Sequence, residues 1–392
     1  MNIDDLLKIA VERGASDLHL KVGNHPILRI DGHLAPLVEL KRLMQENTIA
    51  MAFSMMNESQ RERFKKDHEL DMAYSVPGLG RFRCNVFMQR GAVGIVMRVI
   101  PTQAKTITDL NLPQVLEKIS QERRGLVLVT GTTGSGKSTS LAAMIDFINT
   151  YRVEHVITIE DPIEYLHRDK KSIVNQREIG QDTDSFAKAL RASLREDPDV
   201  ILVGEMRDKE TIETALLAAE TGHLVLSTLH TLDAPETINR VISIFEPHHQ
   251  MQIRLQLASV LRAIISMRLI PRADKKGRVP AVEILINTSY IMECITDPEK
   301  NKLIKDAIAQ GVSQYGMQTF DQSLYHLYQK ELITYDEALK WASNPDEFKL
   351  RKIGLQSTKD MSIEEMERRM SDDNKKNTFG VSEHKELELE LE

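Results

Sequence analysis

The feature that most constrains the fold is a glycine-rich motif behind a short apolar run. Residues 131–138 read GTTGSGKS and satisfy the pattern G-x-x-x-x-G-K-[ST] in full. The motif follows the apolar run 125–130 and precedes a helix predicted over 138–149. A phosphate-binding loop needs this context of strand, turn and helix. A glycine-rich turn without a ligand is the alternative, and the lysine and serine in register count against it.

The motif also predicts which residues hold a phosphate chain. Its glycines let backbone N–H groups curl around phosphate oxygens at the positive end of the following helix. Lys137 would reach the β- and γ-phosphates, and the Ser138 hydroxyl would ligate Mg²⁺. The predicted nucleotide-binding residues are Gly131, Thr132, Thr133, Gly134, Ser135, Gly136, Lys137, Ser138 and Thr139.

Three later segments place acids or histidines at the ends of apolar runs. They are residues 157–164 (ITIEDPIE), 199–208 (DVILVGEMRD) and 221–231 (TGHLVLSTLHT). In open α/β sheets, ligands bind beyond the carboxyl ends of the strands. Taken singly, each acid or histidine is more simply explained as a helix cap or a surface residue. Together, they predict a catalytic centre that converges on the phosphate loop.

The order of apolar runs and helical stretches predicts an α/β fold class. Short continuous apolar strands that alternate with helices are typical of a parallel sheet covered on both faces. The predicted divisions are an α+β domain at 1–100, a linker at 101–120, an α/β nucleotide-binding core at 121–271, a helical subdomain at 272–348 and a charged tail at 349–392. Within the tail, a capping box predicts a short helix over 362–370 that could dock on a partner.

Composition excludes several other classes of protein. The formal charge is −7, with 51 basic and 58 acidic residues, which argues against a sequence-independent nucleic-acid coat or translocase. The two cysteines, Cys84 and Cys294, cannot build a four-thiolate zinc site. The acidic start is unlike a secretory signal, and no apolar run approaches the ~18 residues that span a bilayer. We therefore expect a cytoplasmic protein.

The four segments, in this order, resemble the Walker A, Asp box, Walker B and His box of the secretion-superfamily ATPases, which power type II secretion and type IV pili. ASDLHL at 15–20 and GRFR at 80–83 resemble the pilus retraction branch. The resemblance covers roughly residues 1–348. It implies a PAS-like N-terminal domain, then a RecA-like P-loop ATPase domain with a helical C-terminal extension. Assembly ATPases of this superfamily usually carry an extra N-terminal region and a tetracysteine zinc site, so retraction is the better match.

Within the retraction branch, two features resemble the accessory paralogue PilU more than the principal motor PilT. One is the tail after Phe348. The other is SYIME at 289–293, where the principal motor has an Ala-Ile-Arg motif. The resemblance implies an ATP-hydrolysing hexameric motor subunit that drives pilus retraction and twitching motility together with a principal motor. The alternatives are an ATP-binding accessory scaffold with little turnover and, less favoured, a type II secretion or pilus assembly ATPase.

The resemblance also implies cofactors and partners. The cofactors are ATP and Mg²⁺. The partners are further copies of the chain in a hexamer, the principal retraction ATPase and an inner-membrane platform protein, without nucleic acid. The chain would be peripheral to the cytoplasmic face of the inner membrane.

Catalytic roles follow from the same resemblance. Glu164 would be the general base that orients the attacking water. Glu205 would hold the Mg²⁺ shell, because Gly204 occupies the usual Walker B aspartate position. His223 and His230 would sense the γ-phosphate. The candidate trans-acting fingers are Arg81, Arg83 and Arg98. Each arginine could equally be a salt-bridged residue on a strand face.

Overall fold

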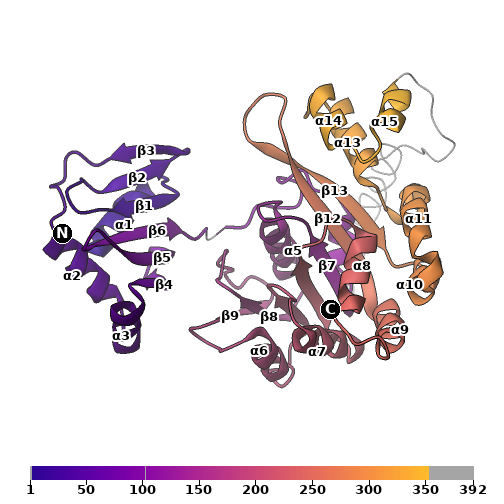
Figure 1. The fold of residues 1–392 in the computed structure, drawn as a ribbon, viewed down its shortest axis with the longest axis horizontal. Coiled ribbons are helices and arrows are strands. Elements are labelled where there is room, and N and C mark those ends of the chain that lie inside the picture. Colours follow the sequence, from indigo (N-terminus) through magenta and orange to yellow (C-terminus); the bar gives the residue numbers. More distant parts are fainter. Residues whose placement is uncertain (1, 102, 353–392) are drawn as a thin grey trace, which may run out of the picture. The chain divides into compact units, whose positions relative to one another are not determined.

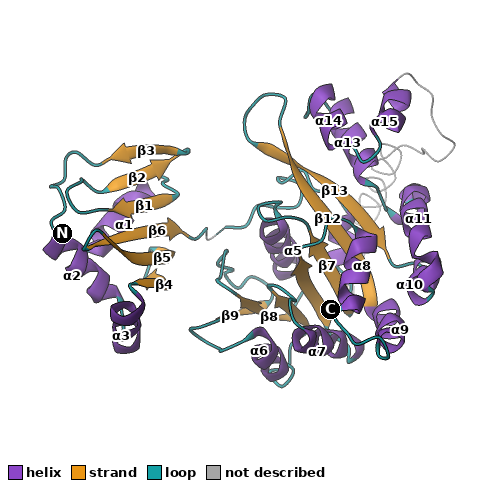
Figure 2. Cartoon of the chain, viewed as in Figure 1, coloured by secondary structure: helices purple, strands orange, loops and turns teal. Residues whose placement is uncertain are grey.

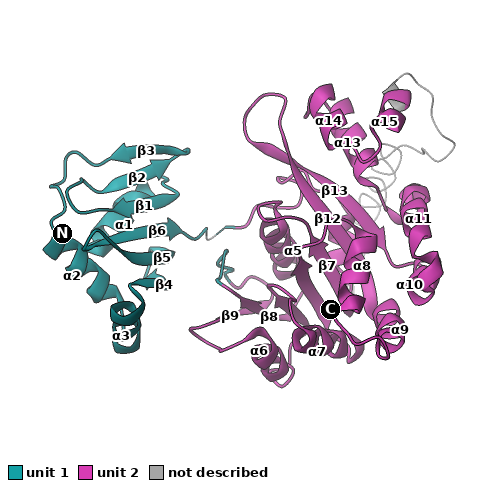
Figure 3. Cartoon of the chain, in the orientation of Figure 1, with its two compact units in different colours: residues 1–103, 162–168 teal, residues 104–161, 169–392 magenta. Residues whose placement is uncertain are grey.

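The computed structural model describes residues 2–101 and 103–352, and its helices and strands are shown in Figure 1. The chain forms two compact units (Figure 3). The first contains residues 1–103 and 162–168, and the second contains residues 104–161 and those from 169 on. The helix predicted over 362–370 and most of the predicted tail lie outside the described residues.

The first unit is built on a six-stranded antiparallel sheet in the order β3-β2-β1-β6-β5-β4. Its strands are β1 (Asp17–Leu20), β2 (Ile27–Ile30), β3 (His33–Pro36), β4 (Glu69–Val76), β5 (Gly80–Gln89) and β6 (Ala92–Val99). Its helices are α1 (Ile3–Glu12), α2 (Gln45–Met55) and α3 (Glu58–Asp67), and they share one apolar core with the sheet. Asp31 and Gly32 join β2 to β3 with φ values of 49° and 84°, as a two-residue hairpin turn requires.

The second unit is built on a seven-stranded sheet in the order β13-β12-β7-β11-β10-β8-β9 (Figure 2). Its strands are β7 (Gly125–Thr130), β8 (His155–Glu160), β9 (Ile173–Glu178), β10 (Val200–Val203), β11 (Leu224–Leu229), β12 (Leu261–Pro271) and β13 (Arg278–Ile286). The pairings are parallel except between β12 and β13. Leu126 and Leu128 enter one apolar core, and Val127 and Val129 enter the other. Because both faces are covered, the central strand β10 is apolar and buried at every position.

Helices flank this sheet and extend beyond it. They are α4 (Val115–Ser120), α5 (Lys137–Tyr151), α6 (Phe186–Ser193), α7 (Lys209–Glu220), α8 (Ala234–Ser243), α9 (Gln250–Val260), α10 (Ser289–Thr296), the 3₁₀ helix η1 (Pro298–Leu303), α11 (Ile304–Gln310), α12 (Val312–Tyr315), α13 (Phe320–Gln329), α14 (Tyr335–Trp341) and α15 (Pro345–Lys352). Within 2–101 and 103–352, no helix has the length and apolar content needed to cross a bilayer.

The hairpin of β12 and β13 departs from the helical layout expected after residue 271. The predicted boundary at 271/272 falls between two paired strands, and β13 extends the same sheet. Sequence reasoning missed this hairpin because α9 ends at Val260 and β12 begins at Leu261, with no glycine or proline to mark the change. Helices α13, α14 and α15 form a separate apolar core with residues of the hairpin, whereas α10 and α11 belong to the larger core of the sheet.

Candidate nucleotide site

The phosphate loop lies between β7 and α5, as predicted, and its shape requires glycine. Gly131 has a φ of 141°, and a Cβ there would lie 2.5 Å from Ser135 Oγ and 2.6 Å from the Met267 carbonyl oxygen. Gly136 has a φ of 98° and stands immediately before α5. These left-handed conformations are ones that residues with a Cβ rarely adopt. The loop therefore curls tightly at the positive end of a fifteen-residue helix.

The polar groups of the loop fit a phosphate ligand. Lys137 is buried, and its Nζ donates to the carbonyl oxygens of Gly131 at 2.8 Å and Thr132 at 3.1 Å. The Ser135 hydroxyl is buried and has no hydrogen-bond partner within the described chain. A buried hydroxyl without a partner costs free energy, which a phosphate oxygen would recover. Ser138 lies in the first turn of α5, where its hydroxyl could join a Mg²⁺ shell.

Strand order brings two of the other predicted residues together. Strand β11 lies between β7 and β10, so His230, directly after β11, lies between the loop strand and the acid that follows β10. That acid, Glu205, has its Oε1 3.3 Å from His230 Nε2. Arg207 Nε lies 2.5 Å from the same oxygen and is 75% exposed. Hydrogen bonding to Glu205 raises the pKa of Arg207 further. The sequence analysis did not identify Arg207 as a site residue, although it belongs to the segment 199–208.

Crowding explains the glycine at the usual aspartate position. A Cβ on Gly204 would lie 3.2 Å from the carbonyl oxygen of Ile159 and 3.4 Å from Glu160 Cα. Strand β8 is the hydrogen-bonded neighbour of β10, and Gly204 N donates to that same Ile159 oxygen at 2.8 Å. A larger side chain would push the two strands apart. The acid of this strand is therefore displaced by one residue, to Glu205.

The structure does not bring His223 to the phosphate edge of its own chain. His223 stands before β11, and its carbonyl oxygen accepts the N–H of Gly125, the first residue of β7. Its Nδ1 lies 2.9 Å from the carbonyl oxygen of Ala218. Six strand residues separate this edge from the loop, about 20 Å at the usual rise of a strand. Sequence reasoning placed both histidines at one edge, although a strand bracketed by two residues holds them at opposite ends.

Glu164 belongs to the first compact unit, together with all three candidate arginines, Arg81, Arg83 and Arg98. Glu164, Arg83 and Arg98 line a cavity of about 310 Å³ in that unit. Arg83 forms a bidentate pair with Asp71, and Arg98 pairs with the buried Asp17. Both arginines are thus salt-bridged residues on a strand face, as the alternative interpretation has it, and both also face a cavity that holds a carboxylate.

A second cavity that sequence reasoning missed adjoins the start of α5. It has a volume of about 430 Å³. Gly136, Thr139 and Ser140 line one side, and the β12–β13 hairpin supplies Arg272 and Arg278. A nucleotide whose phosphates lie on the loop has room for its base or ribose here. This cavity could not be predicted from the sequence, because the hairpin that forms one side of it was not predicted.

A phosphate loop at the end of β7, an acid after β10 and a histidine after β11 together define a P-loop ATPase on a RecA-like sheet. The family model described as "Type II/IV secretion system protein" matches residues 1–352, and the chain belongs to this family. The predicted family, fold class and ATPase activity are therefore confirmed.

Individual relatives show which branch of the family the chain resembles. The type IV pilus retraction ATPase PilT of Pseudomonas aeruginosa is 46% identical over 348 residues, which cover 89% of this chain and 100% of that protein. The type IV pilus ATPase PilU of the same organism is 43% identical over 361 residues, covering 92% and 94%. A crystal structure of the pilus retraction motor PilT with bound ADP superposes with a TM-score of 0.81 at 48% identity, covering 88% of this chain and 98% of that one.

Proposed function

We propose that this chain is an ATP-hydrolysing motor subunit for type IV pilus retraction, the activity behind twitching motility. The contact between Glu205 and His230 beside the phosphate loop carries the proposal, because it joins an acid and a γ-phosphate sensor at one strand edge. Similarity to PilT and PilU over about nine-tenths of the chain supports it. Such a motor binds ATP on the loop and converts the loss of the γ-phosphate into movement.

The residues divide the chemistry among themselves. Backbone N–H groups from Gly131 to Ser138 cradle the phosphates, and Lys137 leaves its two carbonyl partners to neutralise them. Ser138 and Glu205 would hold Mg²⁺, which neutralises the charge on the transferred phosphoryl group when it is bound. His230 transmits the loss of that group through its contact with Glu205.

Further residues complete the proposed centre. Glu164 orients the attacking water as general base, a role worth typically 10²–10⁴-fold in rate. Arg81, Arg83 and Arg98 are the candidate fingers, and an arginine finger contributes ~10³–10⁵ in other P-loop enzymes. His223 would act at a subunit boundary, since its own phosphate loop lies at the opposite edge of the sheet.

The proposed assembly is a hexamer at the cytoplasmic face of the inner membrane, in contact with a platform protein of the pilus machine and with a principal retraction motor. The accessory role rests on residues 289–293, which form the start of α10. Tyr290 and Met292 are 48% and 39% exposed there. Identities of 46% and 43% to PilT and PilU do not separate the two branches, so this role stays a prediction.

Phosphate release by the full chain with Mg-ATP tests the proposal, measured alone and mixed with a principal retraction motor. Glu205→Gln should lower turnover by roughly 10²-fold or more. Glu210→Gln is the matched control, since Glu210 pairs with Arg191 on exposed surface. Turnover that appears only in the mixture and needs Glu205 supports the accessory role. Equal turnover by the wild type and Glu205→Gln in both settings contradicts the motor and leaves an ATP-binding scaffold.

A further inference from the structure

The loop that carries His230 is fixed at its far end by the start of α8. Asp233 caps this helix, because its Oδ1 accepts the backbone N–H of Glu236 at 2.9 Å. The backbone N–H of Ala234 donates to Glu283 Oε1, also at 2.9 Å. His230 therefore lies only a few residues before a hydrogen bond made by a carboxyl group from another strand.

Glu283 lies in a row of residues that runs across the sheet to the phosphate loop. The register pairs Glu283 of β13 with Ser266 of β12, and Ser266 with Thr130 of β7. Thr130 pairs in turn with Leu229 of β11. The hydroxyl of Thr130 donates to Ser266 Oγ at 3.1 Å. Since Thr130 precedes the phosphate loop and Leu229 precedes His230, Glu283 shares the edge of the sheet at which hydrolysis is proposed.

Charged groups from three elements face Glu283. Asp233, which caps α8, repels its negative charge, whereas Lys305 of α11 and Arg268 of β12 attract it. Lys305 Nζ also lies 2.8 Å from Asp233 Oδ2, so the same lysine interacts electrostatically with both acids. Burial is the largest influence and raises the pKa of Glu283 to about 7, although the hydrogen bond from Ala234 opposes the change. The carboxyl group therefore changes its charge close to neutral pH.

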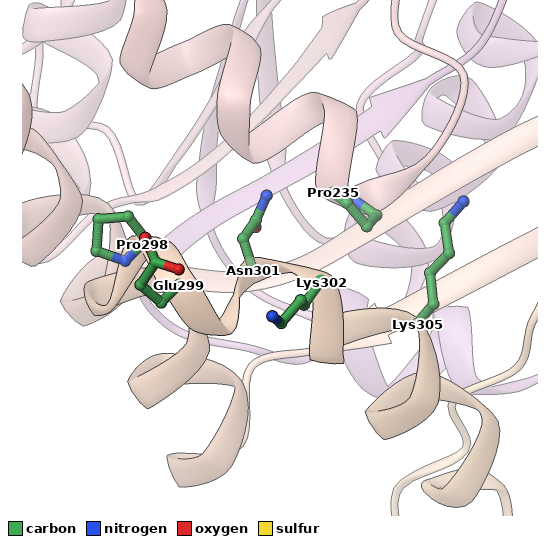
Figure 4. A pocket seen from close by; sticks show the side chains of 6 residues that line it. All are labelled: Pro235, Pro298, Glu299, Asn301, Lys302 and Lys305. Carbon is green, nitrogen blue, oxygen red and sulfur yellow. The ribbon is translucent and has the colours of Figure 1, made fainter.

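A cavity of about 380 Å³ lies beside this junction (Figure 4). Its lining residues are Pro235, Pro298, Glu299, Asn301, Lys302 and Lys305. The side chain of Lys305 is 60% exposed, whereas Glu283 is only 4% exposed. Water can therefore reach the lysine from the cavity, while the carboxyl group depends on its protein neighbours. A change in the charge of Glu283 therefore alters the electrostatic interactions of both α8 and α11.

We propose that Glu283 is a positioning residue that sets how firmly the His230 loop is held, according to its own charge. This inference rests on the proposed function, because it assigns regulation to the same site. Burial disfavours the charged carboxylate, so the protonated acid is the form that the closed site stabilises. Protonated Glu283 therefore holds the start of α8 and keeps His230 opposite Glu205. Ionised Glu283 favours release of both into water, and the change reaches α11 through Asp233 and Lys305.

Amide hydrogen exchange of the full chain tests the structural step without any need for activity. The readout is the segment 229–243 at pH 6 and pH 8, corrected for intrinsic exchange rates. Glu283→Gln keeps an oxygen that can accept from Ala234 but cannot ionise. Glu299→Gln, which removes an exposed carboxylate beside the same cavity, is the matched control. In the wild type and in Glu299→Gln, we expect the start of α8 to exchange several-fold faster at pH 8 than at pH 6, because the held state is stabilised by protonated Glu283 and loses that stability as pH rises through about 7. Glu283→Gln should exchange at both pH values as the wild type does at pH 6.

Steady-state turnover tests the consequence. Between pH 6 and pH 8.5, Glu283→Gln should lose the fall in kcat that the wild type shows as pH rises through about 7, and it should keep the KM for ATP. A uniform fall in kcat at every pH would mean a merely structural role and would overturn the inference, as would identical pH dependence of exchange in Glu283→Gln and the wild type. If the wild type hydrolyses no ATP, the proposed function fails, and the exchange experiment still decides the role of Glu283.

Discussion

Arg98 Nε donates to Asp17 Oδ1 at 2.9 Å across paired strands β1 and β6, so a buried carboxylate holds an arginine whose side chain is 68% exposed. Asp17 also accepts from the Ser16 hydroxyl at 2.8 Å. Burial alone would raise the pKa of Asp17, but the hydrogen bonds from Ser16 and Arg98 lower it overall. Asp17 thus fixes the orientation of the Arg98 guanidinium through one N–H group. The remaining N–H groups of Arg98 stay available in the cavity that Glu164 also lines.

Asp17→Asn should therefore reduce turnover if Arg98 is the finger. We expect kcat to fall by ten-fold or more, with nucleotide affinity unchanged, because the amide cannot hold the guanidinium by charge. Asp71→Asn is the matched control, since Asp71 holds Arg83 in the same way. A larger loss in Asp71→Asn would assign the finger to Arg83 instead. Equal activity in both variants and the wild type would remove both arginines from the mechanism.

Gly131→Ala should abolish nucleotide binding, whereas Gly134→Ala should weaken it modestly. Gly131 combines a φ of 141° with backbone and side-chain atoms within 2.6 Å of a new Cβ, so the loop must open. Gly134 has a φ of 76° but open space around it, so the cost is about 1–2 kcal/mol of backbone strain. Binding of a fluorescent ADP analogue, with thermal unfolding alongside, distinguishes the two. Similar affinities for both variants would contradict this view of the loop.

The two cysteines should resist alkylation in the folded chain. Burial raises the pKa of Cys84 to about 12 and also raises that of Cys294. Only the thiolate reacts, so labelling of Cys84 with iodoacetamide at pH 8 should be roughly 10³-fold slower than in denaturant. The unfolded thiol ionises near pH 8.5, so stability contributed by the protonated Cys84 is present below that pH and falls as pH rises toward 12. Rapid labelling of the native chain, followed by mass spectrometry, would show that Cys84 is accessible.

Arg268→Met should loosen the C-terminal helices from the hairpin. Arg268 Cζ lies 3.8 Å from the ring centroid of Phe320, and its Nη1 donates to the Trp341 carbonyl oxygen at 3.1 Å. Burial lowers the pKa of Arg268, so its charge is only partly solvated. Loss of the cation–π contact and the hydrogen bond should cost about 2 kcal/mol. Urea unfolding measures the cost, and the exposed Arg240→Met is the control. Equal urea midpoints for Arg268→Met and Arg240→Met would contradict this stabilising role of Arg268.

Local patterns were sufficient for much of the fold and of the site. The strands around the phosphate loop were predictable because burial on both faces makes them largely apolar, and Val200–Val203 is apolar at every position. His230 could be predicted because it directly follows such a strand, and Glu205 because a single residue separates it from the end of another. Pairings between distant segments could not be predicted in this way. Arg207 on Glu205, Glu283 on Ala234 and the arginines of the hairpin depend on contacts that no periodicity encodes.

The division of the chain into its two units has a consequence for how such proteins can diversify. The backbone passes between the units at 103/104, 161/162 and 168/169. Residues 162–168 supply Glu164 to a cavity whose arginines come from the first hundred residues. A recombination event that exchanges the N-terminal segment as one block would therefore separate this glutamate from the arginines with which it shares the cavity. We expect the two stretches to be inherited together, and natural chimaeras to cross over elsewhere in the gene.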